Sequence, residues 1–323
     1  MKREAAVRIS KFFLSQGPLL ILLGIIISAS FVYPNFLTAR NIWNVLTQNA
    51  PIGILALGFT FVILMGGIDL SVGSTLALCG AIYATLSHTN MFLAIVIPLL
   101  VGAFVGAMNG FIIAKTKIVP FVVTLASMFA IRGIVYIYSN MFTIPAARTP
   151  AAAFLGRGDL FSVPMPVVVF ISLTLICIFI SKRTTFGRYN FAVGGNEEAA
   201  RYMGLPIDRI KIWVFTMSGL FASICGIVLT SRLQAAQALA GVGWELQALA
   251  IVLVGGTLLT GGVGSFTGTF IGTLIMGLMF NLINQQGTLS SFWQLFIRGA
   301  FLLIVVILQR IVVIYRTRDS VEI

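Results

Sequence analysis

Charged residues are scarce in this sequence. Only 9% of the 323 residues are Asp, Glu, Lys or Arg, whereas 59% are hydrophobic, and the mean hydropathy is +1.04. An ordinary globular domain carries about 25% charged residues. A soluble fold with so few charges could not cover its own surface, so we expect lipid to surround much of the chain.

The sequence also lacks long stretches in which apolar and polar residues alternate. Only helices and closed barrels pair all of their backbone groups inside lipid, and the strands of a membrane barrel alternate over about ten residues. Here the apolar runs are continuous, as in residues 164–180 and 292–308. The sequence therefore predicts an all-α integral membrane protein.

Motifs that carry chemistry are missing as well. The sequence has no GxxxxGK[ST] nucleotide loop, no cluster of metal ligands and no Ser/His/Asp set. Its three cysteines are isolated in or beside apolar runs, which predicts small core residues. We therefore expect a non-catalytic chain with no catalytic residue, metal or cofactor of its own, so that any ATP and Mg would be bound by another chain.

Nucleic acid is not an expected partner, although the net charge is +12. The basic residues cluster beside the ends of apolar runs instead of forming a stripe with interleaved aromatics. We interpret them as flanks of membrane spans.

About ten segments are long and apolar enough to cross a bilayer as helices, which takes roughly 17–25 residues. Residues 1–13 resemble a signal-peptide n-region, but no cleavage motif of small residues follows before Tyr33, so we expect an uncleaved first span. The expected spans are residues 17–33, 46–65, 71–87, 92–114, 119–139, 164–181, 212–232, 246–259, 263–283 and 292–311.

The distribution of basic residues indicates the orientation. Of the 21 Lys and Arg residues, fifteen fall in the segments that ten spans place inside and four in those placed outside, as the positive-inside rule requires. This predicts cytoplasmic N- and C-termini, a cytoplasmic loop at 182–211 and a periplasmic loop at 140–163. We expect one transmembrane domain over residues 1–323, in a bacterial inner membrane.

Glycines that recur at every fourth position indicate close helix packing. They form two series, Gly102-Gly106-Gly110 and Gly264-Gly268-Gly272. Packing within one subunit is the favoured interpretation, and dimerisation is the alternative. Because the device occurs in both halves, and residues 66–70 resemble residues 255–259, an internal pseudo-repeat is possible.

A carboxylate lies between two apolar spans, in the glycine-rich stretch 65–74. A charge near membrane depth marks a functional site by default, so Asp69 and Ser71 are candidate pathway residues. Capping of a helix start and structural hydrogen bonding are the alternative interpretation. Arg132 and Arg298 fall within spans and need compensation, for which Asp69 and Glu245 are the available acids.

Amide and aromatic side chains gather near the expected outer ends of spans. Interfacial Trp is ordinary anchoring, but amides in lipid need polar partners. A lining of this kind suits a neutral polar solute better than an ion. Besides Asp69 and Ser71, the candidate pathway residues are Gln48, Asn49, Trp244, Glu245, Gln247, Asn281 and Asn284.

The cytoplasmic loop contains a predicted short amphipathic helix. Asn196 is placed to cap it, Glu197 and Glu198 suit its first turn, and Gly204 is placed to end it. A surface connector and a docking helix for a soluble partner are both compatible with this pattern. The candidate docking residues are Asn196, Glu197, Glu198, Ala199, Arg201 and Gly204.

Several of these motifs together resemble one family over essentially the whole chain, namely the permeases of bacterial monosaccharide ABC importers, which include the ribose, xylose and galactofuranose systems. Residues 255–264 and 287–291 are most similar to one of the two permeases of the galactofuranose importer. The motifs are Gly66-Gly67-Ile68-Asp69-Leu70-Ser71-Val72-Gly73, Phe186-Gly187-Arg188, Gly194-Gly195-Asn196 with Glu198-Ala199-Ala200, and Val254-Gly255-Gly256-Thr257 through Gly261-Gly262.

The resemblance implies a larger assembly. A second permease, either a paralogue or another copy, would complete the pathway, two cytoplasmic ATP-binding subunits would dock below, and a periplasmic sugar-binding protein would deliver a monosaccharide. Residues 196–205 match the family's coupling helix. The alternatives are a branched-chain amino acid or autoinducer importer permease, an ion-coupled carrier, and a non-transporting scaffold or membrane enzyme.

Overall fold

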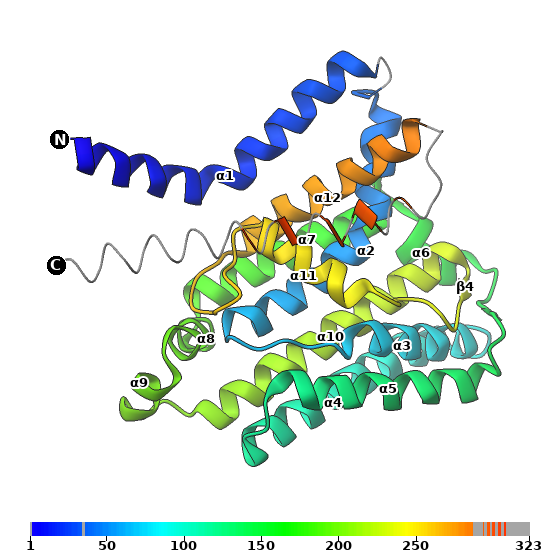
Figure 1. The fold of residues 1–323 in the computed structure, drawn as a ribbon. Helices are drawn as coiled ribbons and strands as arrows, with labels where there is room; N and C mark the ends of the chain where they lie inside the picture. Colours follow the sequence, from blue (N-terminus) through cyan, green and yellow to red (C-terminus); the bar gives the residue numbers. More distant parts are fainter. Residues whose placement is uncertain are drawn as a thin grey trace.

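The protein is described by a computed structural model that covers residues 2–33 and 36–286, and beyond them residues 293, 296, 297, 299, 300, 303, 304 and 307. Most of it is helical (Figure 1). The helices that correspond to expected spans are α1 (Lys2–Val32), α2 (Ala39–Leu64), α3 (Val72–Leu86), α4 (Met91–Thr116), α5 (Pro120–Ser139), α7 (Met165–Arg183), α10 (Ile207–Leu233), α11 (Trp244–Val254) and α12 (Phe266–Gln286). The short elements are β1 (Ile144–Pro145), α6 (Pro150–Arg157), β2 (Asp159–Leu160), β3 (Val163–Pro164), α8 (Thr185–Gly195), α9 (Glu197–Tyr202) and β4 (Ala235–Ala236).

The first nine expected spans each correspond to a helix. Within the described part of the chain, six helices are long and apolar enough to cross a membrane. The segment Gly17–Val32 of α1, together with α3 and α11, is apolar but shorter. The eighth span is shorter than expected, because α11 ends at Val254. The tenth, at 292–311, lies mostly outside the described residues, so the count of ten and the sides of the termini stay predictions.

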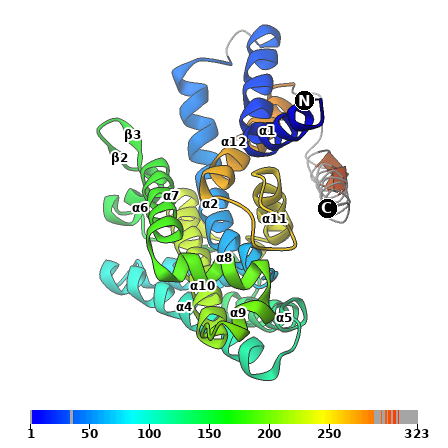
Figure 2. The ribbon, with the colours of Figure 1, turned by 90° about the vertical axis from the view of Figure 1, so that its left-hand side faces the viewer.

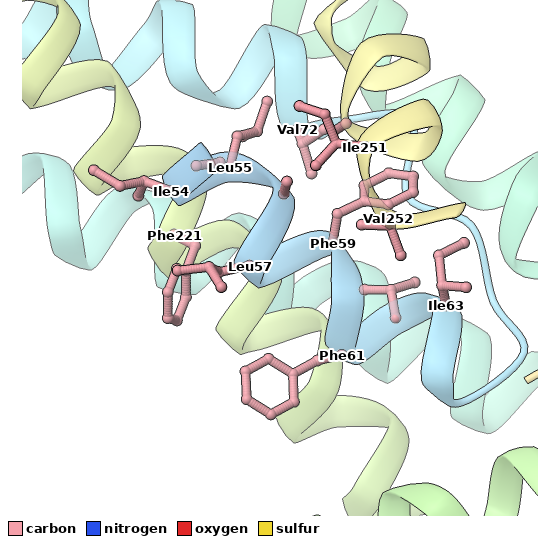
Figure 3. Close-up of a cluster of buried hydrophobic side chains, with 14 of the residues drawn as sticks. Ile54, Leu55, Leu57, Phe59, Phe61, Ile63, Val72, Phe221, Ile251 and Val252 are labelled. Carbon is pink, nitrogen blue, oxygen red and sulfur yellow. The ribbon is translucent and has the colours of Figure 1, made fainter. Parts of the chain in front are cut away.

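Helix α2 forms the centre of the bundle and packs against α7, α8, α10, α11 and α12 (Figure 2). Of the residues in its most hydrophobic stretch, 78% are buried, compared with 28% of the residues in the corresponding stretch of α4. Aliphatic and aromatic side chains project from α2 in several directions (Figure 3). The ring of Phe61 lies near the rings of Phe186, Phe221 and Phe266. A helix that is apolar all round is typical of such a buried position.

Both glycine series pack against neighbouring helices of the same chain. Added Cβ atoms at Gly102 and Gly106 would meet the backbone of α10, and those at Gly268 and Gly272 would meet the backbone of α11. The expectation of close packing within one subunit is therefore confirmed.

The short elements lie at opposite ends of the bundle. Figure 1 shows α8, α9 and the start of α1 at one end, and α6 and β4 at the other. At that second end β1 pairs with β4, and β2 with β3 in a small hairpin. The loop expected to be cytoplasmic and the loop expected to be periplasmic thus lie at different ends, as a spanning bundle requires.

Helices α2 and α11 end in the same way. In α2 the N–H of Gly66 donates to the Ile63 carbonyl at 2.8 Å and that of Gly67 to the Val62 carbonyl at 2.9 Å. In α11 Gly256 donates to Leu253 at 3.0 Å and Thr257 to Val252 at 3.2 Å. Both are Schellman motifs with a left-handed glycine, at φ 85° in Gly66 and 87° in Gly256. These two endings agree with the predicted pseudo-repeat, but the register differs by one residue, because Gly66 corresponds to Gly256 and not to Gly255. We call the segments that follow them break 1 (residues 65–71) and break 2 (residues 255–265).

Candidate functional site

Break 1 holds a buried carboxylate. Asp69 is 1% exposed. Its Oδ1 accepts hydrogen bonds from the backbone N–H and the hydroxyl of Ser71, at 3.0 and 2.6 Å, and its Oδ2 accepts from the hydroxyl of Ser218 in α10 at 2.7 Å. Asn109 of α4 donates to Ser71 Oγ at 3.0 Å. The carboxylate therefore ties break 1 to α10 directly and to α4 through Ser71.

These hydrogen bonds satisfy Asp69 without a substrate, as buried polar groups require. The arrangement supports the structural interpretation of this residue, and a pathway role for Asp69 and Ser71 stays a prediction. Sequence reasoning overlooks Asn109 and Ser218. An asparagine within a membrane helix signals a polar partner, which would have drawn attention to α4 but not to Asp69 in particular.

Arg132, the half-buried arginine of α5, is compensated by carbonyl oxygens. Its Nη1 donates to Ala238 at 3.0 Å and to Ala240 at 2.8 Å, both in the segment between β4 and α11. Glu245 acts on it only through its charge. The hypothesis of an ion pair between Arg132 and Asp69 is therefore wrong, because the Asp69 carboxylate is bonded to Ser71 and Ser218. The hypothesis of a pair involving Arg298 is not tested, since Arg298 lies outside the described residues.

A ladder of amides joins α2 to α12. Asn41 and Asn281 donate to each other's Oδ1, at 3.4 and 3.0 Å, and Gln285 donates to Asn281 at 3.1 Å. Asn49 donates to the Val45 carbonyl at 2.8 Å, and its side chain lies against Gly277. Two expected pathway residues, Asn49 and Asn281, thus lie along one helix pair, and Asn41 is a member that the sequence did not indicate.

Gln48 of α2 and Asn284 of α12 belong to the same pair of helices. Both side chains are exposed on the surface of the single chain, and Asn284 has an interaction of its own.

The start of α11 holds the remaining candidates. Trp244 is partly buried and packs on the main core, and Gln247 is 6% exposed. Glu245 Oε1 accepts a hydrogen bond from the Gly243 N–H at 3.2 Å. Its Oε2 lies beside Gly73 of α3, so close that a Cβ added to Gly73 would be 2.5 Å from it.

The expected pathway residues therefore fall into three groups, which are break 1, the α2–α12 ladder and the start of α11. Glu245 lies beside Gly73 at the start of α3, two residues after the end of break 1.

The predicted cytoplasmic helix is present as α9. The Asn196 side chain accepts from the Ala199 N–H at 2.9 Å, as a cap should. Gly204 is left-handed, at φ 77°, and its N–H donates to the Arg201 carbonyl at 3.0 Å. The expected beginning and end of this helix are confirmed.

Electrostatic contacts hold α9 against α10. Glu197 Oε1 accepts from Lys211 at 2.8 Å and from Arg201 at 3.2 Å. Burial by itself would raise the pKa of Glu197, but the hydrogen bonds and positive charges of Lys211 and Arg201 outweigh it and bring the pKa below its ordinary value of 4.5. Ala200 is buried, whereas Tyr202 is 91% and Met203 70% exposed. One side of α9 is thus fixed and its end projects from the bundle.

Comparison with known proteins gives a consistent result. The family model described as "Branched-chain amino acid transport system / permease component" matches residues 41–306. The ribose import permease protein RbsC of Bacillus subtilis (strain 168) is 42% identical over 297 residues, covering 91% of this chain and 92% of that protein. No solved structure matches the chain.

Two further relatives come from Escherichia coli (strain K12). The inner membrane ABC transporter permease protein YjfF is 39% identical over 318 residues, covering 94% of this chain and 95% of that protein. The xylose transport system permease protein XylH is 35% identical over 334 residues, covering 84% and 85%. Together with the bundle of apolar helices, these matches show that the chain is a multi-pass membrane protein of the branched-chain amino acid transport system permease family.

Proposed function

We propose that the chain is the permease subunit of an ATP-driven importer of a monosaccharide in a bacterial inner membrane. The observation that carries this proposal is the 42% identity to a ribose import permease over nearly the full length of both chains. The xylose system permease and the ABC transporter permease among the relatives support the same assignment.

The geometry suits a subunit of an assembly more than a carrier that works alone. The candidate polar groups are distributed over three places, and Gln48 and Asn284 face outward from the single chain. A second permease, either a paralogue or another copy, would bring such surfaces together around a pathway. Amides and a tryptophan offer hydrogen bonds and an apolar face, which a sugar can use without any buried charge.

Helix α9 is the proposed docking element for a cytoplasmic ATP-binding subunit. It lies at the end of the bundle that carries the basic loop (Figure 1). Its ion pairs with Lys211 keep it in place, while Glu198, Tyr202 and Met203 are exposed for a partner. In this role Asn196 and Gly204 define the ends of the helix, and Ala199 and Arg201 shape its surface.

The cargo is proposed at two levels. A monosaccharide is favoured over a branched-chain amino acid, which the family description would allow, because similar permeases belong to ribose and xylose systems. Within the sugars, the resemblance of residues 255–264 makes galactofuranose the first to test, with ribose and xylose beside it.

Reconstitution tests the function directly. The chain would be purified with its operon ATPase and second permease, placed in proteoliposomes, and assayed for ATP hydrolysis with a periplasmic binding protein loaded with galactofuranose, ribose, xylose or leucine. Stimulation by one sugar-loaded protein, with sugar uptake, is the expected result. Stimulation by leucine alone would favour the amino acid importer, and uptake without the ATPase would show an ion-coupled carrier.

A further inference from the structure

Three segments of backbone meet where the two breaks approach the cytoplasmic loop. The residues at the meeting point are Gly66 of break 1, Gly194 and Gly195 at the end of α8, and Gly261 and Gly262 of break 2, which we call the glycine junction. The Gly262 N–H donates to the carbonyl of Leu64, the last residue of α2, at 2.9 Å. Break 2 is thereby attached to the end of α2.

Side chains at Gly194 and Gly261 would not fit inside this junction. A Cβ on Gly194 would collide with the Leu64 carbonyl and would stand 2.7 Å from the Gly262 nitrogen. A Cβ on Gly261 would lie 2.8 Å from the Gly66 nitrogen and 2.9 Å from the Gly194 carbonyl oxygen. Gly195 differs, because a Cβ there would meet nothing within 4 Å.

Helix α8 is held to α2 at a second point. The side chain of Asn190 is 1% exposed and donates to the Phe61 carbonyl at 3.0 Å. The ring of Phe186 lies 5.8 Å from the ring of Phe61. Only Asn196, the cap of α9, separates α8 from α9. The cytoplasmic helix pair is therefore anchored to the end of α2 as well as to α7, which precedes it in the chain.

We propose that the glycine junction transmits the position of α9 to the end of α2 and to break 2, and that Gly194 is a positioning residue for transport. The inference rests on the proposed function, in which α9 receives the ATP-binding subunit. A force on α9 would pass through α8 into the carbonyl of Leu64 and the backbone of Gly262. Packed backbones have no side-chain rotamers that could absorb a displacement, so a small shift at one end reaches the other.

Two neighbouring substitutions test the proposal. Gly194→Ala and Gly195→Ala each change a helical glycine of α8, so both receive the same gain in helix propensity. Only the first adds an atom to the junction. In the reconstituted importer, we expect Gly194→Ala to lower the amount of sugar imported per ATP hydrolysed by about tenfold, a typical size for coupling between sites. Gly195→Ala should stay near wild type.

Co-purification with the ATPase and the thermal unfolding midpoint of each variant separate coupling from folding. If Gly194→Ala assembles and imports sugar as wild type does, the proposal is overturned. If it fails to assemble, Asn190→Ala, which adds no atom, takes its place: reduced import per ATP supports the proposal, and wild-type import overturns it. A wild-type importer without sugar-stimulated hydrolysis would overturn the proposed function itself, and the inference with it.

Discussion

The two breaks begin alike and then diverge. Their Schellman motifs have the same hydrogen bonds at corresponding residues. The corresponding residues are also buried to the same degree, up to Ile68 in break 1 and Leu258 in break 2. The next position separates them, because Asp69 is 1% and Leu259 37% exposed. Break 1 is then fixed by side-chain hydrogen bonds of a buried carboxylate, whereas break 2 is held by backbone contacts and by glycines at φ 85° and 72°, Gly261 and Gly262.

This difference indicates that the two breaks have different mechanical roles. Both oxygens of the Asp69 carboxylate accept hydrogen bonds, and buried polar groups that are paired in this way rigidify their surroundings, so break 1 serves as a fixed point. Break 2 contains no carboxylate; the hydroxyl of Ser265 accepts from the Gly268 N–H at the start of α12, and the glycines before it have wide conformational freedom. We therefore expect break 2 to be the part that changes shape when α8 and α9 move, and break 1 to keep its conformation.

Removal of the carboxylate should have the largest effect. Asp69→Ala leaves the Ser71 N–H and the Ser218 hydroxyl buried without their acceptor, at a cost of about 3 kcal/mol in the free energy of unfolding. The matched change in break 2, Leu259→Ala, removes a partly exposed side chain and should cost less than about 1 kcal/mol. Unfolding in a graded detergent series measures both. Equal losses of unfolding free energy in the two variants would contradict the proposed difference between the breaks.

The left-handed glycines should behave alike, because the two endings share one geometry. Gly66→Ala and Gly256→Ala each place a Cβ in a left-handed conformation, which costs roughly 1–2 kcal/mol. The same unfolding assay compares them. A cost confined to one of the two variants would show that the internal correspondence does not extend to energetics.

The contact between break 1 and α10 should contribute less than the whole network. Ser218→Ala removes one hydrogen bond to Asp69 Oδ2 and should destabilise the protein by about 1–2 kcal/mol. Ser223→Ala, in the same helix, removes only a hydroxyl that donates to the Leu220 carbonyl within α10, and its effect should be smaller. If Ser223→Ala proved the more damaging of the pair, Ser218 would not be an anchor of break 1.

Acid should loosen the contact between α9 and α10. Because the pKa of Glu197 in the folded protein lies below its ordinary value, the Glu197–Lys211 contact contributes stability at neutral pH and loses it as the pH falls through the folded-state pKa. Limited proteolysis of the 196–205 segment over a descending pH series would follow this. Glu197→Gln should abolish the pH dependence, and an unchanged profile in that variant would assign the effect to another group.

The sequence predicts the helices well, since continuous apolar runs have few alternatives in lipid. It also predicts the ends of α9, because Asn196 and Gly204 act through local geometry. The sequence does not predict the long-range pairings. The contact of Asp69 with Ser218 and the contacts of Arg132 with two carbonyls depend on how α10 and α5 pack, and no local pattern encodes that packing. The glycine junction could not be predicted from the sequence for the same reason, since its residues come from three distant segments.

The central claim is that break 1 is fixed and break 2 changes shape during transport. Amide hydrogen exchange of the reconstituted importer, in the nucleotide-free state and in an ATP-trapped state, tests it most directly. The account predicts unchanged protection over residues 65–71 and altered protection over residues 255–265. Altered protection in the first segment with none in the second would contradict it.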